Sequence, residues 1–420
     1  MTEIHLDPNL SRYASRTRGM NASEIRALFA VASRPEIAFL AGGMPFTAAL
    51  DMEAVQAVTH EVLRDHGADA LQYGGGQGLG SLRAQLVEVM AAEHTPAHPE
   101  DLVVTTGGQQ GLDLVAKLFC DPGDVILAEG PSYVGALGAF AAYEADVRHV
   151  PMDADGLVPE ALEETLLSLA SDGRRPKFLY TIPNHQNPAG VSLSDHRRVQ
   201  LIDIARRHDL LIVEDNPYGL LDFKGEVRAS LRSLAPERVL YIGTLSKIFS
   251  PGVRCGWVAA PTAMRDKLVL LKEAADLCQS NFTQYVAERW LSTQPWLDQV
   301  KAYREVYRER CDALLHELAE SFPPGCTWNA PTGGFFVWAR VPDGLDTKEL
   351  LARALNARVA YVPGKAFYAD GAGEREMRLS FCYSSPARIR EGIRRLAEVL
   401  VEEIELVQAV YGTAGRQDRT

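Results

Sequence analysis

Short apolar runs alternate with helical patterns between about residue 100 and residue 260. Each run is continuous and lacks the alternation of apolar and polar residues that a half-exposed strand shows. We therefore expect strands that are buried on both faces at Leu102–Val104, Val125–Leu127, Phe178–Tyr180, Leu210–Val213, Val239–Ile242 and Trp257–Ala259. Helices between such strands indicate an α/β architecture, in which helices cover a mostly parallel sheet.

Helical patterns fill the segments between and after these runs. We expect helices over Gly111–Phe119 and Asp195–His208, and Ser194 stands in the N-cap position of the second one. The charged segment Trp296–Phe322 has a helical pattern that is long enough to connect two domains.

The pattern changes after Pro323, where strand-like segments return and are followed by an amphipathic helix that begins at Pro386. Such a segment forms a smaller α+β unit of its own, and the first residues of the chain are expected to join it. The sequence therefore predicts a large domain over residues 50–300 and a small domain formed by residues 1–49 and 301–420.

Composition narrows the choice of partner and compartment. The 420 residues include 55 acidic and 43 basic side chains, a formal charge of −12 that disfavours nucleic acid and anionic membranes. The first residues lack the apolar segment of a signal peptide, and no apolar run approaches the roughly 20 residues that a membrane helix needs. Six scattered cysteines without a C-x-x-C pair indicate reduced thiols and no zinc site. We expect a cytoplasmic protein that binds small molecules and no metal.

The segment from Gly243 to Trp257 carries the strongest chemical signal. Lys247 stands there between two apolar strands, with Ser246 before it and Arg254 after it. Because lysine is rarely buried without a role, this placement indicates a Schiff-base amine beside a phosphate site that Ser246 and Arg254 would hold. Taken alone, the segment also fits a surface lysine in a tight turn.

Two further segments end buried strands in polar residues. Asp215 follows such a strand, and a carboxylate at this edge of a sheet can keep a pyridinium nitrogen protonated. Asn187 follows another strand and offers an amide that can bind a phenolate oxygen. In isolation, Asp215 could instead cap a helix, and Asn187 could simply begin an Asn-Pro turn.

Other candidates are weaker when each is taken alone. Gly108 and Gln109 lie where a strand leads into a helix, and free backbone N–H groups at such a point attract an anion such as phosphate. Tyr133 could stack on a cofactor ring or be an ordinary core tyrosine. Arg378 stands in an apolar strand-like run and could grip an α-carboxylate or form an internal ion pair.

Together these segments resemble the class I/II aminotransferases of fold type I, and among them the branch of the 2-aminoadipate and kynurenine aminotransferases. The resemblance spans roughly Ser15 to Leu400, and its specific signature is S-K-x-x-x-P-G-x-R-x-G at Ser246–Gly256, preceded in the expected order by Asn187, Asp215 and Tyr218. It implies pyridoxal 5′-phosphate (PLP) as cofactor. It also implies a large domain with a mostly parallel seven-stranded sheet.

The resemblance also implies roles for individual residues. Lys247 would hold the cofactor as a Schiff base and move the substrate proton, and Asp215 would bind the ring nitrogen. Asn187 and Tyr218 would bind the ring hydroxyl, and Tyr133 would stack on the ring. The phosphate would be held by Gly108, Gln109, Ser246 and Arg254, and the substrate by Arg378, Gly43 and Asn187.

Two residues in the resemblance point beyond a single active site. Tyr73 corresponds to a tyrosine that reaches the phosphate of the neighbouring subunit, which implies a homodimer with shared active sites. Arg26 aligns with a mobile N-terminal helix that, in the aminoadipate branch of the family, can contact the distal carboxylate of a substrate. An arginine on the surface of a helix is the more common interpretation. The sequence leaves open whether Arg26 or His185 contacts the substrate.

The predicted activity is ping-pong transfer of an amino group from an L-amino acid to a 2-oxo acid, with 2-oxoglutarate as the expected acceptor. The donor stays open between 2-aminoadipate-like, aromatic and non-proteinogenic biosynthetic amino acids. Ala189 replaces the threonine that is usual in the family after Asn-Pro, and His185 and the Met44-Pro45-Phe46 segment are diagnostic of no single substrate. A PLP-dependent lyase, decarboxylase or oxidase on the same scaffold is the alternative.

Overall fold

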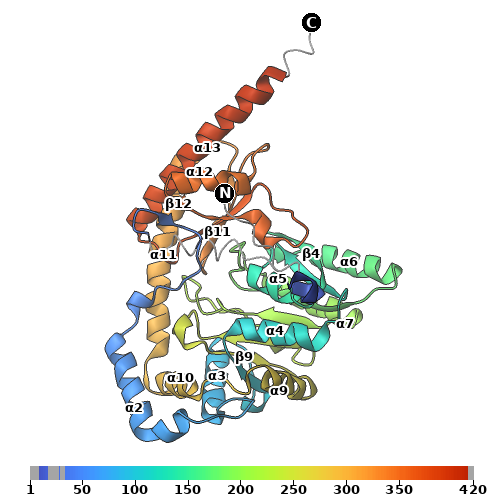
Figure 1. Ribbon diagram of the computed structural model, residues 1–420, viewed down its shortest axis with the longest axis vertical. Coiled ribbons are helices and arrows are strands. Elements are labelled where there is room, and N and C mark those ends of the chain that lie inside the picture. The colour runs from blue at the N-terminus through green and yellow to red at the C-terminus, as the bar shows by residue number, and fades with distance from the viewer. Residues whose placement is uncertain (1–8, 18–27, 29–33, 415–420) are drawn as a thin grey trace.

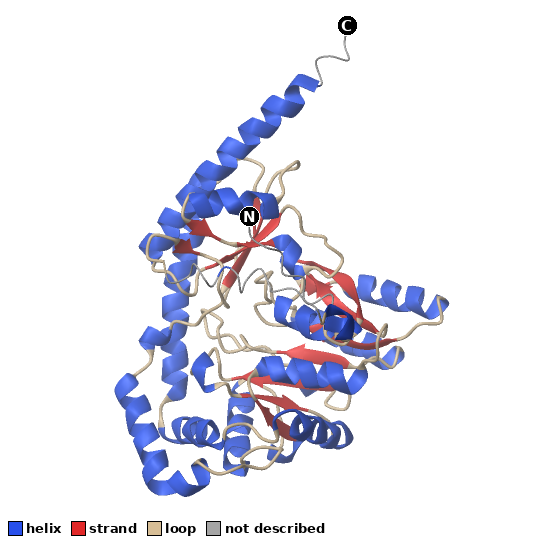
Figure 2. Ribbon diagram, in the orientation of Figure 1, coloured by secondary structure: helices blue, strands red, loops and turns tan. Residues whose placement is uncertain are grey.

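The computed structural model describes residues 9–17, 28 and 34–414. Figure 1 shows a broad α/β part and, beside it, a smaller sheet along which two long helices, α11 and α13, run. Figure 2 shows the strands gathered into these two regions with helices around them. Among the described residues, no helix has the length and apolar character that crossing a membrane requires.

The large sheet has the strand order β2-β9-β8-β7-β6-β3-β4-β5. Strands β8, β7, β6, β3 and β4 are mutually parallel, whereas β9, β2 and β5 pair antiparallel with their neighbours. Their bounds are β2 Leu102–Thr105, β3 Val125–Gly130, β4 Asp146–Asp153, β5 Gly156–Leu157, β6 Pro176–Thr181, β7 Ile212–Asp215, β8 Val239–Thr244 and β9 Gly256–Ala259. The expected seven-stranded, mostly parallel sheet is therefore present, and the two-residue β5 adds a hairpin at its edge.

Successive residues of the central strands face two different hydrophobic clusters. In β3, Ile126 and Ala128 belong to the cluster on one face, and Val125 and Leu127 belong to the cluster on the other. Burial on both faces explains why these strands are continuous apolar runs in the sequence. The strand β4 lies near the sheet edge, is only partly buried and has the polar sequence DVRHVPMD, so its pattern did not reveal it.

Helices cover both faces of the large sheet (Figure 1). Helix α4 begins three residues before the expected start, at Gly108, and Ser194 occupies the N-cap position of α7 without a capping bond from its side chain. The helices of this part are α2 Met52–Ala70, α3 Gly80–Ala92, α4 Gly108–Phe119, α5 Val134–Ala141, α6 Pro159–Ser171, α7 Asp195–Arg207, α8 Leu231–Leu234, α9 Thr262–Asp276 and α10 Asn281–Thr293.

The second sheet has the order β10-β11-β14-β13 and is antiparallel throughout. Its strands are β10 Thr327–Trp328, β11 Phe336–Arg340, β13 Val362–Pro363 and β14 Glu376–Ser380. Nearby, β1 (Ala38–Phe39) pairs in parallel with β12 (Val359–Ala360), so an early segment of the chain lies against a late one.

Three further helices and several short 3-10 turns complete the part of the chain that the structure describes. The helices are α11 Trp296–Ser321, α12 Thr347–Asn356 and α13 Pro386–Ala414, and α11 packs along α13. The 3-10 turns are η1 Leu10–Arg12, η2 Ser15–Thr17, η3 Thr47–Ala49, η4 Pro99–Asp101, η5 Pro251–Val253 and η6 Gly364–Phe367. The expected long helix is thus present, and it ends at Ser321.

Candidate active site

The candidate site lies at the carboxyl ends of the central parallel strands. Asp215 is the last residue of β7 and pairs with Ile242 of β8, and Lys247 follows β8 by three residues. Asn187 lies in the loop after β6, and Tyr133 follows β3. Because parallel strands end at the same edge of a sheet, residues from four separate segments meet there.

Lys247 is a half-buried lysine whose amine points into this site. Its Nζ donates to the carbonyl oxygen of Gly43 at 3.0 Å and lies 5.3 Å from the ring centre of Phe335. Burial lowers the pKa of this amine to about 8, a shift that the Cys382 thiol and the Asp215 carboxyl oppose. A lysine in this state has a substantial neutral fraction near neutral pH, which nucleophilic chemistry requires.

Asp215 is buried, and no arginine of the described residues forms an ion pair with it. Burial raises the pKa of its carboxyl to about 7, although the Tyr180 hydroxyl and the Lys247 amine both favour the charged form. The Tyr180 hydroxyl donates to Asp215 Oδ2 at 2.9 Å. A carboxyl held in this way gains stability from a cationic ligand group, because such a group would offset the cost of burying its charge.

Arg378 of β14 lies between two aromatic rings. Its guanidinium carbon is 4.1 Å from the ring centre of Phe336 and 5.0 Å from that of Phe367. Nη1 donates to Asn187 Oδ1 at 2.8 Å and Nη2 donates to a backbone carbonyl, whereas the buried Nε has no hydrogen-bond partner within the described part of the chain. This buried cation therefore has a donor available for an anionic ligand.

The Asn187–Arg378 bond also determines which end of the asparagine amide can bind a ligand. Because Oδ1 accepts from Arg378, the amide nitrogen is the end that can donate to a ligand oxygen. Tyr218 lies nearby, is 3% exposed and packs edge-on against Phe335 at 5.3 Å between ring centres. The predicted partners of the ring hydroxyl thus lie in the same site as Arg378.

The predicted phosphate-binding residues surround the start of α4. Gly107 has a positive φ of 77° and precedes Gly108, and a Cβ on Gly256 would lie 2.7 Å from the Gly107 backbone, so the two segments need glycine to approach this closely. Arg254 Nη2 donates to the Thr106 carbonyl at 3.2 Å. Ser246 Oγ accepts from Thr244 at 2.9 Å.

Gln109 and Tyr133 lie side by side at the edge of this cradle. The Tyr133 hydroxyl lies 3.4 Å from Gln109 Oε1, and Gln109 Nε2 donates to the Gly135 carbonyl at 2.7 Å. Burial raises the pKa of Tyr133, and the Asp215 carboxyl raises it further. The structure therefore brings the predicted ring-stacking residue and the predicted phosphate-binding residues together.

Three candidate residues remain, of which one is exposed, one is buried and one lies outside the described residues. Tyr73 is 77% exposed, and its neighbour Leu71 is 74% exposed. His185 is buried against Asp222, with Nε2 3.8 Å from Oδ2, and burial lowers its pKa to about 4. Arg26 lies outside the described residues.

Sequence reasoning missed several residues that shape the site. Glu129, the penultimate residue of β3, is buried, and burial raises the pKa of its carboxyl to about 7. It accepts hydrogen bonds from Thr181 at 2.5 Å and from Gln186 at 3.2 Å. Gln186 also donates to the Pro131 carbonyl at 2.8 Å, so it ties the Tyr133 segment to the Asn187 loop. Glu129 could have been found from the sequence, because it is an acidic residue at the end of a buried strand, as Asp215 is.

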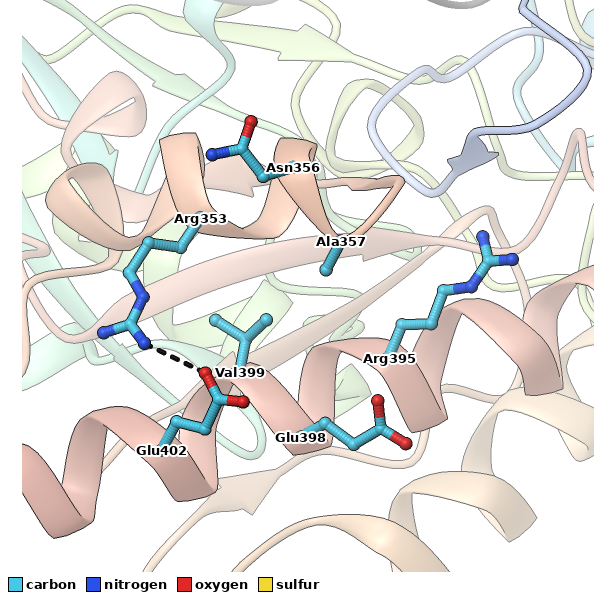
Figure 3. Close-up of a pocket in the computed structure, with 7 residues that line it drawn as sticks. All are labelled: Arg353, Asn356, Ala357, Arg395, Glu398, Val399 and Glu402. Carbon is cyan, nitrogen blue, oxygen red and sulfur yellow. Dashed lines mark hydrogen bonds and ion pairs between the residues drawn. The ribbon is translucent and has the colours of Figure 1, made fainter.

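A separate hollow of about 280 Å³ lies on the surface between α12 and α13. Figure 3 shows its charged side chains, with Arg353 bonded to Glu402 at 3.0 Å. Its lining residues are Arg353, Asn356, Ala357, Arg395, Glu398, Val399 and Glu402. None of the predicted site residues lines it.

A lysine amine, a buried acid and an arginine at the carboxyl edge of an α/β sheet form the arrangement of an enzyme that uses lysine chemistry on an anionic substrate. The sequence profile of the family described as Aminotransferase class I and II matches residues 37–396, and the chain belongs to this family. It is thus a PLP-dependent aminotransferase.

Individual relatives agree with this assignment over nearly the whole chain. Aromatic-amino-acid aminotransferase 1 of Thermococcus litoralis is 42% identical over 94% of this chain and 95% of its own length. The 2-aminoadipate transaminase of Thermus thermophilus is 38% identical over 92% of this chain and 96% of its own. The kynurenine aminotransferase of Pyrococcus horikoshii, solved with its substrate and product, has a TM-score of 0.90 at 38% identity, and the match covers 94% of this chain and 98% of that one.

The residues present fit PLP. A buried carboxyl with a raised pKa can take up a cationic ring nitrogen, and the Asn187 amide nitrogen can face a ring oxygen. The start of α4, with Arg254 beside it, presents backbone N–H groups and a positive charge to a phosphate. Each of the three polar ends of the cofactor thus has a matching group in this chain.

Proposed function

We propose that this aminotransferase takes its amino group from an L-amino acid with an aromatic or 2-aminoadipate-like side chain, or from a related non-proteinogenic amino acid. 2-Oxoglutarate is the proposed acceptor in a ping-pong cycle. Support comes from the relatives, whose names include aromatic-amino-acid aminotransferase and 2-aminoadipate transaminase. A half-buried, aromatic-lined site also suits a donor with a large side chain, because Phe335, Phe336 and Tyr218 pack together beside Lys247.

In the proposed mechanism, Lys247 holds the cofactor and moves the substrate proton. When bound, PLP withdraws electrons from the substrate Cα and carries the amino group between the two substrates. A lysine amine whose pKa burial has lowered to about 8 can accept the Cα proton and return it, because both of its protonation states are populated near neutral pH. The Gly43 carbonyl, 3.0 Å from Nζ, orients this amine.

The remaining roles follow the geometry of the site. Asp215 would bind the ring nitrogen, Asn187 and Tyr218 would bind the ring hydroxyl, and Tyr133 would stack on the ring. Gly108, Gln109, Ser246 and Arg254 would hold the phosphate. Arg378 would bind the substrate α-carboxylate through Nε, which has no partner among the residues that the structure describes, with Gly43 facing the substrate.

We also propose a homodimer with shared active sites in the cytoplasm. The exposed Leu71 and Tyr73 side chains support a second chain at this surface, and Tyr73 would reach the partner's phosphate. Arg26 would meet the distal carboxylate of an acidic donor or acceptor. The division into a large domain, residues 50–300, and a small domain, residues 1–49 and 301–420, accompanies this proposal, and the pairing of β1 with β12 supports it.

The observation that carries the proposal is the convergence of Lys247 and Asp215, at the carboxyl edge of the large sheet, with Arg378 of the second sheet. The test is a half-reaction screen in which the yellow, cofactor-loaded enzyme receives one amino acid at a time without an oxo acid. We expect loss of the yellow absorbance with release of the matching 2-oxo acid, and aromatic amino acids or 2-aminoadipate should react fastest. Release of ammonia or carbon dioxide from an enzyme that stays yellow would instead support a lyase or a decarboxylase.

A further inference from the structure

His149 of β4 connects the large sheet to a segment that lies beside the second sheet. Its Nδ1 lies 2.8 Å from the carbonyl oxygen of Glu129, the residue next to its partner position in β3. Its Nε2 lies 2.8 Å from the backbone nitrogen of Ala369, which follows η6. The half-buried imidazole therefore joins two parts of the chain that are 240 residues apart, since Ala369 and Glu129 differ by that number.

The chemistry of the two partners determines where the imidazole proton must lie. The Glu129 carbonyl can only accept, so Nδ1 must carry the hydrogen. The Ala369 N–H can only donate, so Nε2 must present a lone pair. Only the neutral Nδ1–H tautomer satisfies both partners, because an added proton on Nε2 would face the Ala369 N–H.

The hydrogen bonds from Glu129 through His149 to Ala369 form a bridge between two segments, and both segments carry active-site residues. Glu129 is followed by the segment that carries Tyr133, and Ala369 comes two residues after Phe367, whose ring packs on the Arg378 guanidinium at 5.0 Å. A second bond, from Ser132 N to the Phe367 carbonyl at 2.9 Å, runs beside the bridge. The bridge thus helps to keep the Arg378 pocket and the Tyr133 segment at a fixed separation.

The packing around the bridge is close. The Tyr368 ring meets the His149 ring edge-on, with 5.4 Å between ring centres. A Cβ on Gly130 would lie 3.1 Å from His149 Cβ and 3.5 Å from Tyr368, so the absence of a side chain at Gly130 lets the two segments approach. A substitution at His149 would therefore disturb the packing of both the Gly130 segment and the Tyr368 segment.

We propose that His149 is a positioning residue for the Arg378 pocket. As the neutral Nδ1–H tautomer it holds the segment Phe367–Ala369 against the Tyr133 segment. The functional part of the proposal rests on the role of Arg378 in binding the substrate carboxylate. A side chain that cannot make both hydrogen bonds should therefore loosen this contact.

Several ionisable groups surround the imidazole. On β4, Arg148 is adjacent in sequence and is paired with Asp146 at 2.9 Å. On the Ala369 side, the Tyr368 hydroxyl interacts with Glu376, Asp370 and Arg340. The Glu129 carboxyl is bonded to Thr181 and Ile182. Variants that change His149 alone and keep all of these groups are therefore needed to assign an effect to this imidazole.

The first test measures hydrogen exchange of the Ala369 amide in the cofactor-loaded wild type and in two variants at pH 8. His149→Phe, which can accept no hydrogen bond from Ala369, should lose about three- to tenfold in protection, the range that the loss of one hydrogen bond gives. His149→Gln, whose amide offers a donor and an acceptor, should keep the protection of the wild type.

The second test measures KM and kcat for L-phenylalanine, or for L-2-aminoadipate if it reacts faster, with the same proteins. KM of His149→Phe should exceed that of the wild type about three- to tenfold at pH 8, with a smaller change in kcat. His149→Gln, which can make both hydrogen bonds, should keep the KM of the wild type. His196→Gln, a substitution of an exposed histidine on α7, is the matched control and should follow the wild type.

The outcomes separate the parts of the proposal. Equal protection of Ala369 in the wild type and His149→Phe would overturn the bridge, and an unchanged KM in a variant that has lost protection would overturn its role in positioning. If the wild type transfers from neither donor while the exchange results are as expected, the proposed donor class is wrong and the hydrogen bonds of His149 stand. Melting temperatures of the variants will identify any general loss of folding.

Discussion

Two charged regions of this protein differ in what their charges do. The hollow between α12 and α13 pairs its ions near water: Arg353, whose side chain is 40% exposed, bonds Glu402, which is 68% exposed (Figure 3). At the carboxyl edge of the large sheet, burial displaces the pKa of Lys247 to about 8 and that of Asp215 to about 7. Ion pairs at a protein surface lose little solvation when they form. Buried charged groups that lack a full set of partners are found mainly where they bind a ligand.

The two regions also differ in how many elements build them. The hollow is formed by one helix pair, whereas the active site collects residues from β3, β6, β7, β8 and β14. Segments that are far apart in sequence can only be held together by a rigid core, and here that core is the sheet with its two buried faces. The difference predicts large effects of substitutions at the sheet edge and small ones at the hollow.

The largest effect is expected for Lys247→Ala. The variant loses the amine that holds the cofactor and moves the Cα proton, so turnover should fall by at least about 10⁴-fold. Steady-state kinetics with excess PLP and 2-oxoglutarate measures this loss, and circular dichroism should show a folded protein. Lys301→Ala, which removes an exposed lysine paired with Asp298, is the control and should keep full turnover. Turnover near the wild-type value in Lys247→Ala would contradict the proposed mechanism.

The next effect is expected for Arg378→Lys. The substitution keeps the charge but removes the planar fork that lies between Phe336 and Phe367 and bonds Asn187. We expect kcat/KM to fall about 10- to 150-fold, the range for losing hydrogen bonds to a charged group. Arg353→Lys in the hollow is the matched substitution. Equal kcat/KM in both variants would mean that the buried arginine binds no substrate carboxylate.

A smaller and more specific effect is expected for Tyr180→Phe. The Tyr180 hydroxyl donates to Asp215 and favours its charged form, so its removal should raise the pKa of Asp215 further. The acidic limb of the profile of kcat/KM against pH should therefore move to higher pH, with about a two- to tenfold loss of activity on that limb. Tyr361→Phe removes a buried tyrosine hydroxyl that donates to the Thr347 carbonyl and should leave the limb unmoved. A shift to lower pH would reverse our assignment of this bond.

The sequence revealed those parts of the fold and site that leave a local pattern. Central strands such as β7 appear as apolar runs because both faces are buried, whereas β4 is half-exposed and polar and therefore gave no such run. Asp215 and Lys247 were found because they interrupt or border apolar strands. Tyr180 and Phe367 could not be found in this way, because a tyrosine or phenylalanine in an apolar run is normally core, and only the tertiary contact shows what it touches.

The smallest effect is expected for Arg353→Ala in the hollow. Its guanidinium bonds Glu402 and Glu403 on α13, but an exposed ion pair gains little because water competes for both charges and salt screens them. The free energy of unfolding should change by no more than about 1 kcal/mol, and kcat/KM should stay at the wild-type value. Urea unfolding at low and high salt measures the first quantity, and the difference between wild type and variant should shrink as salt is added. A large loss of activity would show that this hollow communicates with the sheet edge, and the contrast between the two regions would then fail, because a paired and exposed charge would be serving the reaction as well.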